Sequence, residues 1–320
     1  MRPKPYFLIV GILGILISML LGACAPAKPA GEITLKLALL PILEALPMHV
    51  AEQEGYFAEE GVKVEFIPVF SAAERDQIMA AGQADGMIND LVSTLLYNQE
   101  TPQIQIVSFA QSATSEVPQY RILASGDSGF SSVADLKGVE IGISEGSVIE
   151  YITDRLLHAE GFTEDDIKTV AVPKIPDRLS LLGSGELKAA TLPDPFGSLA
   201  IQSGAVLMVD DSKYPQYGNS EISFRKAVID ENPEAIRGFL KALNKAIADI
   251  NADPAKYENL LVEKKLIPAP LIGNHKIPPF PQGQVPSESQ WADVLAWAQE
   301  KGLITADVPY HDSVTDTFLP

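Results

Sequence analysis

A run of apolar residues near the beginning of the chain starts its first folded unit. Residues 33–40 are almost wholly apolar, which predicts a strand buried on both faces. A helix should follow, because Pro47 suits a first helical turn and Gly55 suits a helix end. A second apolar run, 62–69, predicts the next strand, parallel to the first. The loop 41–46 then lies at the carboxyl end of the first strand, where open parallel sheets bind their ligands.

The rest of the chain continues to alternate between helical and extended patterns. The first series comprises a helix 71–82 with a capping box of Ser71 and Glu74, a strand 84–89, a helix 91–98 capped by Asp90, and a strand 104–110. The second series comprises strands 139–144, 167–173, 187–192 and 205–210, with helices begun by Ser147, by Asp177 or a neighbour, and by Asp194 with Pro195. Segments 120–125 and 222–229 are predicted as strands that cross between the two series. Further helices are expected from Asn232, over about 254–264 and over 288–301.

The two series share one design. Residues 81–86 and 184–189 occupy the same helix–glycine–strand position in each of them. This predicts an α/β fold of two similar lobes, each a mainly parallel sheet flanked by helices, with one lobe interrupting the other. The first lobe would comprise 32–119 and 226–320, and the inserted second lobe would comprise 120–225.

The first residues do not belong to this fold. Residues 1–23 combine a positive start, an apolar run too short for a membrane span and a Leu-Gly-Ala boundary before Cys24, as in a secretory signal. One interpretation is a plain signal peptide with an incidental cysteine. The interpretation we favour is that this boundary resembles the bacterial lipobox, which makes Cys24 the lipidated first residue. The protein would then be exported and anchored by lipid to the cell membrane, facing the periplasm or the cell exterior, with 24–31 as a tether.

The charge balance is strongly acidic. The chain of 320 residues carries 42 Asp and Glu against 24 Lys and Arg, a net charge of −18. This argues against nucleic acid as a partner, because there is no basic stripe to neutralise phosphates. Cys24 is the only cysteine, so neither a disulfide nor a cysteine metal site is expected. No metal site is expected from the histidines either, since they lack paired metal spacing: His49, His158, His275 and His311.

Four stretches carry a family resemblance, in the right order, over nearly all of 33–250. They are ALPMHVAEQEGYFAEEGVKVEF (45–66), SAAERDQIMAAGQADGMIND (71–90), VADLKGVEIGISEGS (133–147) and LLGSGELKAATLPDPFGSLAIQSG (181–204). Gly-Tyr-Phe-x-x-Glu-Gly at 55–61 and Asp-Leu-Lys-Gly at 135–138 are fairly specific in that context. The chain resembles the periplasmic binding proteins of ABC importers, in the branch that includes nitrate, sulfonate, taurine and thiamine-pyrimidine binders.

The resemblance implies the two-lobed, type II periplasmic-binding-protein fold, with two crossover strands and a ligand cleft that closes on binding. It also implies that a monomer without a cofactor delivers a small solute to a membrane permease and its ATPase. One departure lies at 185–189, where this chain has Gly-Glu-Leu-Lys-Ala and the family usually has Gly-x-x-Asp-Ala. The second lobe therefore lacks that aspartate.

Five strand-to-helix turns should face the cleft. They lie at 41–46, 70–74, 89–90, 144–147 and 193–196, and each ends at a helix N-terminus with free N–H groups. Taken singly, Ser71, Asp90, Ser147 and Asp194 are better explained as caps of their own helices. Gathered in one crevice, the turns predict a binding site. The candidate ligand-binding residues are Glu44, Leu46, Phe70, Ser71, Asn89, Asp90, Tyr120, Ser144, Glu145, Gly146, Ser147, Asp194 and Phe196.

The charges in these turns favour one class of ligand. Glu74 and Glu150 are expected to close capping boxes, whereas Glu44 and Glu145 have no such local role and are the better ligand contacts. Arg75 is the only basic residue there, and we expect it to point away. Such a cleft would repel nitrate or a sulfonate and would accept a neutral or cationic nitrogen compound.

Aromatic residues near the turns could hold a flat ring between them, although each of them also suits an ordinary core. They are Phe70, Phe109, Tyr120, Tyr151 and Phe196. Arg121 is the counter-evidence, because it could reach an anionic ligand group or pair with Glu116. The expected solute is flat and nitrogen-containing, similar to a thiamine pyrimidine or a related vitamin precursor. A sulfonate or nitrate is the alternative.

Two other functions compete with that of an importer's solute receptor. Enzymes on this fold make the thiamine pyrimidine or act in menaquinone synthesis, but the pyrimidine synthases carry a cysteine-rich motif that this sequence lacks. No Gly-x-Ser-x-Gly elbow occurs either, so we expect no enzyme. A surface sensor that feeds a signalling protein would need the same cleft. A neighbouring permease and ATPase gene would favour import, and a neighbouring kinase or cyclase gene would favour sensing.

Overall fold

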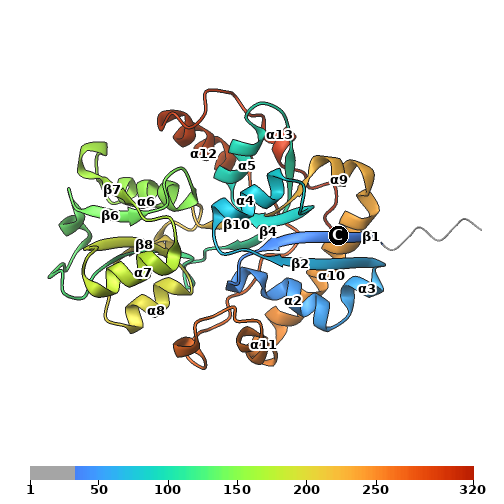
Figure 1. Ribbon diagram of the computed structural model, residues 1–320, viewed down its shortest axis with the longest axis horizontal. Helices are drawn as coiled ribbons and strands as arrows, with labels where there is room; N and C mark the ends of the chain where they lie inside the picture. Colours follow the sequence, from blue (N-terminus) through green and yellow to red (C-terminus); the bar gives the residue numbers. More distant parts are fainter. Residues whose placement is uncertain (1–32) are drawn as a thin grey trace, which may run out of the picture. The chain divides into compact units, whose positions relative to one another are not determined.

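The structure, a computed structural model, describes residues 33–320 and contains two five-stranded sheets, each flanked by helices (Figure 1). The first sheet has the order β2-β1-β3-β10-β4 and consists of β1 (Ile33–Leu39), β2 (Val62–Pro68), β3 (Gly86–Asn89), β4 (Ile104–Ser112) and β10 (Asn219–Arg225). The second has the order β7-β6-β8-β5-β9 and consists of β5 (Tyr120–Ala124), β6 (Glu140–Ile143), β7 (Lys168–Ala171), β8 (Ala189–Pro193) and β9 (Val206–Asp210). The expected α/β class is confirmed. The expected signal segment 1–23, tether 24–31 and Cys24 lie outside the described residues.

Each sheet contains a strand that runs against both of its neighbours. In the first sheet β1 and β3 are parallel, whereas β10 is antiparallel to β3 and to β4. In the second sheet β6 is parallel to β7 and β8, whereas β5 is antiparallel to β8 and β9. The two antiparallel strands, β5 and β10, adjoin the two connections between the sheets, 113–119 and 211–218.

Most of the helices occupy predicted positions, but the short helices Tyr56–Glu59, Lys226–Glu231 and Tyr310–Ser313 were not predicted. The helices that lie along the chain between or after the strands of the first sheet are α2 (Leu46–Gln53), α3 (Tyr56–Glu59), α4 (Ala72–Ala80), α5 (Leu91–Asn98), α9 (Lys226–Glu231), α10 (Pro233–Ala252), α11 (Glu258–Glu263), α12 (Glu288–Glu300) and α13 (Tyr310–Ser313). With the second are α6 (Val148–Ala159), α7 (Ile175–Ser184) and α8 (Phe196–Gln202). Gly55 and Gly185 take left-handed φ values of 78° and 76°, which explains why glycine stands after α2 and α7.

The return strand lies earlier than predicted. The segment 222–229 was expected to be extended, but β10 covers Asn219–Arg225 and the following residues form α9. The predicted strand began too late because Asn219, Ser220 and Glu221 are polar, although all three are buried within the sheet. Because β10 pairs in the first sheet, it joins that sheet although the expected second lobe extends to residue 225.

The start of α8 also differs from the expectation that Asp194 caps it. The helix begins at Phe196 with Pro195 at the N-cap position. The Asp194 carboxylate still accepts the backbone N–H of Ser198 at 3.1 Å. It therefore satisfies one free N–H group of the first helical turn, although it is the residue before the N-cap.

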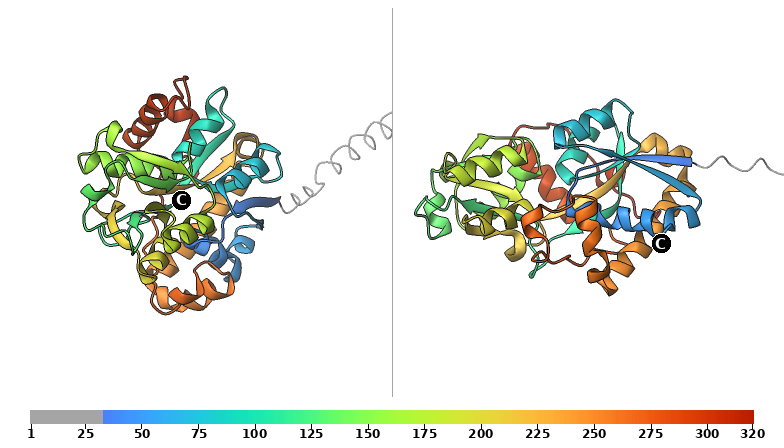
Figure 2. Two further views of the ribbon diagram at one scale, coloured as in Figure 1. Left: turned by 60° about the vertical axis from the view of Figure 1, so that its left-hand side comes forward. Right: turned by 60° about the horizontal axis from the view of Figure 1, so that its bottom comes forward.

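Helix α12 connects the cores of the two sheets. Trp291 and Trp297 pack in one apolar cluster with Leu91 of α5, Ile152 of α6 and Ile122 of β5. Figure 1 and both views of Figure 2 show this helix, in red, beside α5 and α6. The last helices therefore pack on both lobes rather than on the first alone.

Candidate ligand-binding site

A pocket lies between the two sheets, where β1 and β3 of the first and β6 and β8 of the second end. It has a volume of about 760 Å³, including open solvent at its mouth. Its position fits the rule that open parallel sheets bind ligands at the carboxyl ends of their strands.

The structure brings eight of the thirteen predicted site residues into the lining of this pocket. They are Glu44, Phe70, Ser71, Asn89, Asp90, Tyr120, Ser144 and Ser147. Ser144 and Ser147 come from the second lobe and the first six from the first sheet's turns and the start of β5. Turns far apart in the sequence therefore meet here, as the fold prediction required.

The other five predicted residues do not line the pocket within the described part of the chain. Leu46 is fully buried at the start of α2, and the side chain of Glu145 is exposed to solvent. Gly146 donates its backbone N–H to Glu150 at 2.7 Å, and Asp194 pairs with Arg121. Phe196 is partly buried at the start of α8.

Three of the residues that line the pocket also cap helices. Ser71 Oγ accepts the N–H of Glu74 at 3.1 Å, Asp90 accepts that of Ser93 at 2.8 Å, and Ser147 Oγ accepts that of Ile149 at 3.2 Å. These contacts hold the three side chains at helix N-termini beside the pocket. Each of them keeps further acceptor capacity for a ligand.

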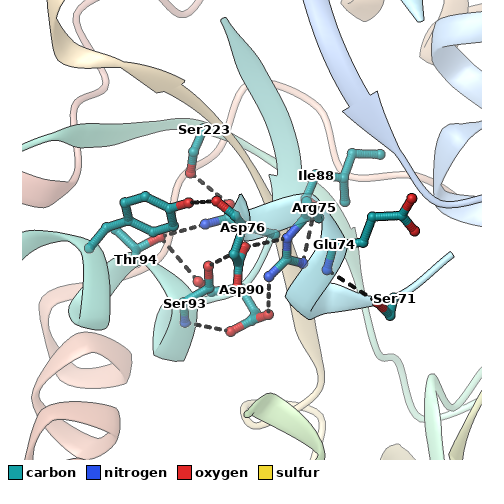
Figure 3. A network of polar contacts seen from close by, with 11 residues as sticks. Ser71, Glu74, Arg75, Asp76, Ile88, Asp90, Ser93, Thr94 and Ser223 are labelled. Carbon is teal, nitrogen blue, oxygen red and sulfur yellow. Dashed lines mark hydrogen bonds and ion pairs between the residues drawn. The ribbon is translucent and has the colours of Figure 1, made fainter. Parts of the chain in front are cut away.

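Arg75 does not point away, so that expectation is wrong. Its side chain lines the pocket and is nearly buried, with 5% of the residue exposed. Figure 3 shows its guanidinium between two carboxylates, with Nε donating to Asp76 at 2.8 Å and Nη2 3.6 Å from Asp90. Nη1 donates to the Ile88 carbonyl at 3.3 Å. The sequence contained a signal for this orientation. Arg75 lies four residues after Ser71, and residues four apart share one helix face.

Carboxyl groups dominate the charge of the pocket. Glu44 keeps some exposure, but the surrounding protein excludes water from it, and this burial raises the pKa of its carboxyl to about 7. Burial also raises the pKa of Asp90, whereas the Arg75 charge and the Ser93 N–H act to lower it. Among the described residues that line the pocket, Arg75 is the only cationic side chain.

Glu221 is a further acidic group that the sequence did not single out. It lies on β10, is fully buried, and neither carboxyl oxygen has a hydrogen-bond partner among residues 33–320. Burial, and then the charges of Asp90 and Glu44, raise the pKa of Glu221 well above the ordinary value.

Two of the five predicted aromatic residues line the pocket. Phe70 is 68% exposed, unusual for a phenylalanine, whereas Tyr120 is almost fully buried. Tyr151 packs on Trp297 and donates its hydroxyl to Asp293 at 2.7 Å, and Phe109 is buried in β4. Tyr151 and Phe109 therefore belong to the core, which was one of the two interpretations given for these aromatic residues.

Arg121 pairs with Asp194 instead of with Glu116 or a pocket ligand. Both side chains are nearly buried, so the two charges neutralise each other beside the pocket rather than within it. Arg121 therefore offers no free cation for an anionic ligand.

Residues 33–320 contain no group of three or more His, Cys, Asp or Glu side chains arranged to hold a metal ion. Over the same residues, every helix is too short or too polar to cross a membrane.

Comparison with known proteins yields both binding proteins and an enzyme. Residues 43–257 match the NMT1/THI5-like family. The riboflavin-binding protein RibY of Chloroflexus aurantiacus is 25% identical over 366 residues, covering 96% of this chain and 97% of RibY. A 4-amino-5-hydroxymethyl-2-methylpyrimidine phosphate synthase of Aspergillus parasiticus is 23% identical over 292 residues, covering 85% of this chain and 83% of that protein.

Among solved structures, the periplasmic aliphatic sulphonate binding protein SsuA from Escherichia coli superposes with a TM-score of 0.74. The two chains are 18% identical, and 89% of this chain and 92% of SsuA are covered. This likeness confirms the periplasmic-binding-protein fold that the four sequence stretches predict.

Proposed function

Because this chain belongs to the NMT1/THI5-like family, we propose that it is the substrate-binding protein of an ABC importer and captures a flat, nitrogen-containing organic solute. The observation that carries the proposal is the charge of the pocket between the sheets. Glu44 and Asp90 line it, and its one cation, Arg75, among the described lining residues already pairs with Asp76 and Asp90.

The pocket suits a ligand that donates hydrogen bonds. Glu44 is poised to give up its proton near neutral pH, because its pKa is raised to about 7 by burial. A ring N–H or an amino group beside it would meet a carboxylate acceptor, and such charge-assisted hydrogen bonds are the stronger ones. Phe70 and Tyr120 provide aromatic surface for the ring itself.

The relatives support the same ligand class. RibY is named for binding riboflavin, and the Aspergillus protein for making a pyrimidine phosphate. Flavins and aminopyrimidines are both flat nitrogen heterocycles. The solute would then be a vitamin precursor of this kind, delivered to a permease and its ATPase.

An anion is the second candidate ligand, and one observation favours it. Arg75 reaches the pocket lining, and SsuA, which shares the fold, is named for binding aliphatic sulphonates. An anion would have to compete with two aspartates for that guanidinium and would face Glu44, which places it second.

Binding rather than catalysis is proposed in spite of the synthase relative. The pyrimidine synthases depend on a cysteine-rich motif, and Cys24 is the only cysteine of this chain. The polar groups that line the pocket form hydrogen bonds that hold helix starts and strand ends, as Ser71, Asn89 and Asp90 do. A rigid polar lining of this kind suits recognition.

Calorimetry on the purified mature protein tests the ligand class. Riboflavin, 4-amino-5-hydroxymethyl-2-methylpyrimidine, hexanesulfonate and nitrate would be titrated into the wild type, Glu44→Gln and Glu145→Gln. We expect a heterocycle to bind and Glu44→Gln to weaken it about tenfold or more, since tenfold is about 1.4 kcal/mol. Glu145→Gln is the matched control, because it removes the same charge from an exposed position outside the pocket lining. Tight binding of nitrate or hexanesulfonate, unchanged or tightened by Glu44→Gln, would make the anion candidate correct.

We also propose that the protein is exported and held at the membrane by a lipid on Cys24. The Leu-Gly-Ala-Cys boundary and the absence of another cysteine support this. Cys24→Ala should release the protein from the membrane fraction of producing cells. If this variant fractionates with membranes as the wild type does, the anchor assignment is wrong.

A further inference from the structure

Arg178, a fully buried arginine of α7 in the second lobe, carries a charge that no carboxylate of residues 33–320 pairs with. Its Nη1 donates to the Val172 carbonyl at 2.8 Å and to Ser144 Oγ at 2.9 Å. Nε and Nη2 have no hydrogen-bond partner among the same residues. Burial lowers the pKa of the guanidinium to about 10, with no nearby charge to oppose it, so the group stays charged at neutral pH.

An arginine in these surroundings costs stability. A buried charge without a counter-charge loses its hydration, and a guanidinium cannot escape that cost by releasing its proton. Its apolar stem packs on Gly142 of β6, where an added Cβ would lie 3.4 Å from Arg178 Cγ. An unbranched apolar side chain would pack there equally well, so packing alone does not explain why an arginine stands at this position.

The guanidinium joins two turns that line the main pocket. Ser144 follows β6, and Val172 and Pro173 follow β7. Ser144 and Pro173 both line the pocket, and Ser144 Oγ donates to the Pro173 carbonyl at 3.0 Å. Arg178 itself does not line the pocket. It lies behind the second-lobe wall, and Ser144 Oγ is the atom through which it reaches a ligand.

Arg178 decides which way that hydroxyl acts. A serine hydroxyl has one hydrogen and two lone pairs, and the Arg178 N–H occupies one of the lone pairs. Accepting from a cation makes the hydroxyl a stronger donor. Its hydrogen can turn from the Pro173 carbonyl to a ligand, because Pro173 is exposed and water can replace the lost contact.

The two walls of the pocket therefore differ in character. The first lobe presents the carboxyl groups of Glu44 and Asp90, which accept hydrogen bonds when ionised. The second lobe presents a hydroxyl donor, Ser144, with a positive charge behind it. A ligand that suits both walls has hydrogen-bond donors on one side and an acceptor on the other.

We propose that Arg178 is a positioning residue for ligand specificity, which holds Ser144 as the donor for a ring nitrogen or carbonyl oxygen on the side of the ligand that faces the second lobe. The inference rests on the proposed function and adds a requirement for the solute, namely an acceptor opposite its donor groups. An anion gains little from this arrangement, because Arg178 does not reach the pocket to pair with it.

A double-mutant cycle tests whether Arg178 acts through Ser144. Riboflavin and 4-amino-5-hydroxymethyl-2-methylpyrimidine would be titrated by calorimetry into the wild type, Arg178→Met, Ser144→Ala and the double variant. Arg237→Met is the matched control, because it makes the same substitution in α10 at a side chain that is 38% exposed. Urea denaturation would measure the stability of each variant.

We expect Arg178→Met and Ser144→Ala each to weaken the probe that binds about tenfold. The double variant should bind within about twofold of Ser144→Ala, because the two residues act as one unit. Arg178→Met should be at least as stable as the wild type, since it removes an unpaired buried charge. Arg237→Met should leave the affinity unchanged.

Ser144→Asp distinguishes an acceptor on the ligand from a donor. It replaces the hydroxyl by a carboxylate that only accepts hydrogen bonds, so a ligand acceptor should bind it more weakly than it binds Ser144→Ala. Binding as tight as that of Ser144→Ala, or tighter, would show that the ligand donates to this wall and would overturn the proposal.

Three further results would overturn the role of Arg178 and leave the proposed ligand class intact. They are an unchanged affinity in Arg178→Met, losses that add in full in the double variant, and a loss of affinity in Arg178→Met that comes with a loss of stability. Failure of both probes to bind the wild type would overturn the proposed function, and this inference with it.

Discussion

Asp211 accepts the backbone N–H of Gln119 through Oδ1 at 2.9 Å, which ties together the two segments that connect the sheets. Its other carboxylate oxygen accepts the N–H of Tyr120 at 3.2 Å. The carbonyl of Gly218 completes the arrangement by accepting the N–H of Ala113 at 2.6 Å. The segments 113–119 and 211–218 therefore form one hydrogen-bonded connection between the sheets.

Gly218→Ala should break this connection. A Cβ at this position would lie 1.8 Å from Asp211 Oδ2 and 2.9 Å from the Cβ of Ala113. We expect a loss of about 1–3 kcal/mol in the free energy of unfolding, which is typical of overpacked sites. Urea denaturation measures it.

Gly183→Ala is the matched control for that substitution. A Cβ at Gly183, within α7, meets no atom within 4 Å. Alanine is favoured over glycine inside a helix by about 1 kcal/mol, so this variant should be as stable as the wild type or more stable. Equal effects of the two substitutions would contradict the role given to Gly218.

Glu221→Gln should change how the stability depends on pH. Burial raises the pKa of Glu221 in the folded state, so the folded protein binds more protons than the unfolded chain above the ordinary carboxyl pKa. The wild type should therefore lose stability as the pH rises from about 4.5 towards the folded-state pKa. Asp211, with a pKa raised to about 7 by burial, contributes to the same slope.

The variant removes the Glu221 part of this slope. We expect Glu221→Gln to be more stable than the wild type at pH 8 and the difference to shrink as the pH falls to 5. Urea denaturation at both values measures it. A difference that is the same at pH 5 and pH 8 would show that Glu221 does not titrate on unfolding.

Ligand affinity should depend on the protonation of Glu44. With a pKa of about 7, roughly a tenth of the free protein carries the Glu44 carboxylate at pH 6 and most of it does at pH 8. A ligand that donates to the carboxylate should then bind about tenfold more tightly at pH 8. Riboflavin or the aminopyrimidine, whichever binds, would be titrated at both values. Glu44→Gln should flatten the profile, and a profile unchanged by this substitution would count against the assignment.

Lys301→Met should destabilise the junction between α12 and α6. Lys301 Nζ lies 2.8 Å from Asp154 Oδ2, which also accepts the Trp297 indole N–H at 2.8 Å. Asp154 is fully buried, so loss of the lysine leaves a carboxylate with a single donor. We expect a cost of about 1–3 kcal/mol in the free energy of unfolding.

Two further variants check the reason for that cost. Lys276→Met removes a charge at an exposed position and should cost little. The double variant Asp154→Asn, Lys301→Met should recover part of the loss, because no unpaired carboxylate then remains. If the double variant is less stable than Lys301→Met by the full cost of Asp154→Asn alone, the two residues are not coupled.

Much of the fold could be predicted because burial leaves a local pattern. The apolar runs at 33–40 and 62–69 are strands, and α4 and α12 start where expected, although Glu74 accepts the N–H of Phe70 and does not close the predicted capping box with Ser71. The return strand β10 departs from this pattern. Its first three residues are polar, and only their pairing with β3 and β4 shows that they are buried.

The sequence predicted which turns form the site, but it did not predict which side chains of those turns point into the pocket. The turn 144–147 was correctly placed, yet Ser144 and Ser147 line the pocket while Glu145 is exposed. The direction of the Arg75 side chain was mispredicted for the same reason, because Asp90, which follows β3, meets it only in the fold.

The short distance between Ala113 and Gly218 has an evolutionary consequence. An inserted segment whose two ends are hydrogen-bonded neighbours can be replaced by that of a relative without redesign of the flanking chain. Because α12 shares the apolar cluster of the second lobe, it would have to be exchanged together with the insert. The unit of recombination is therefore discontinuous, 114–217 with 288–300, and chimaeras that respect it would carry half of a binding pocket from one ligand class to another.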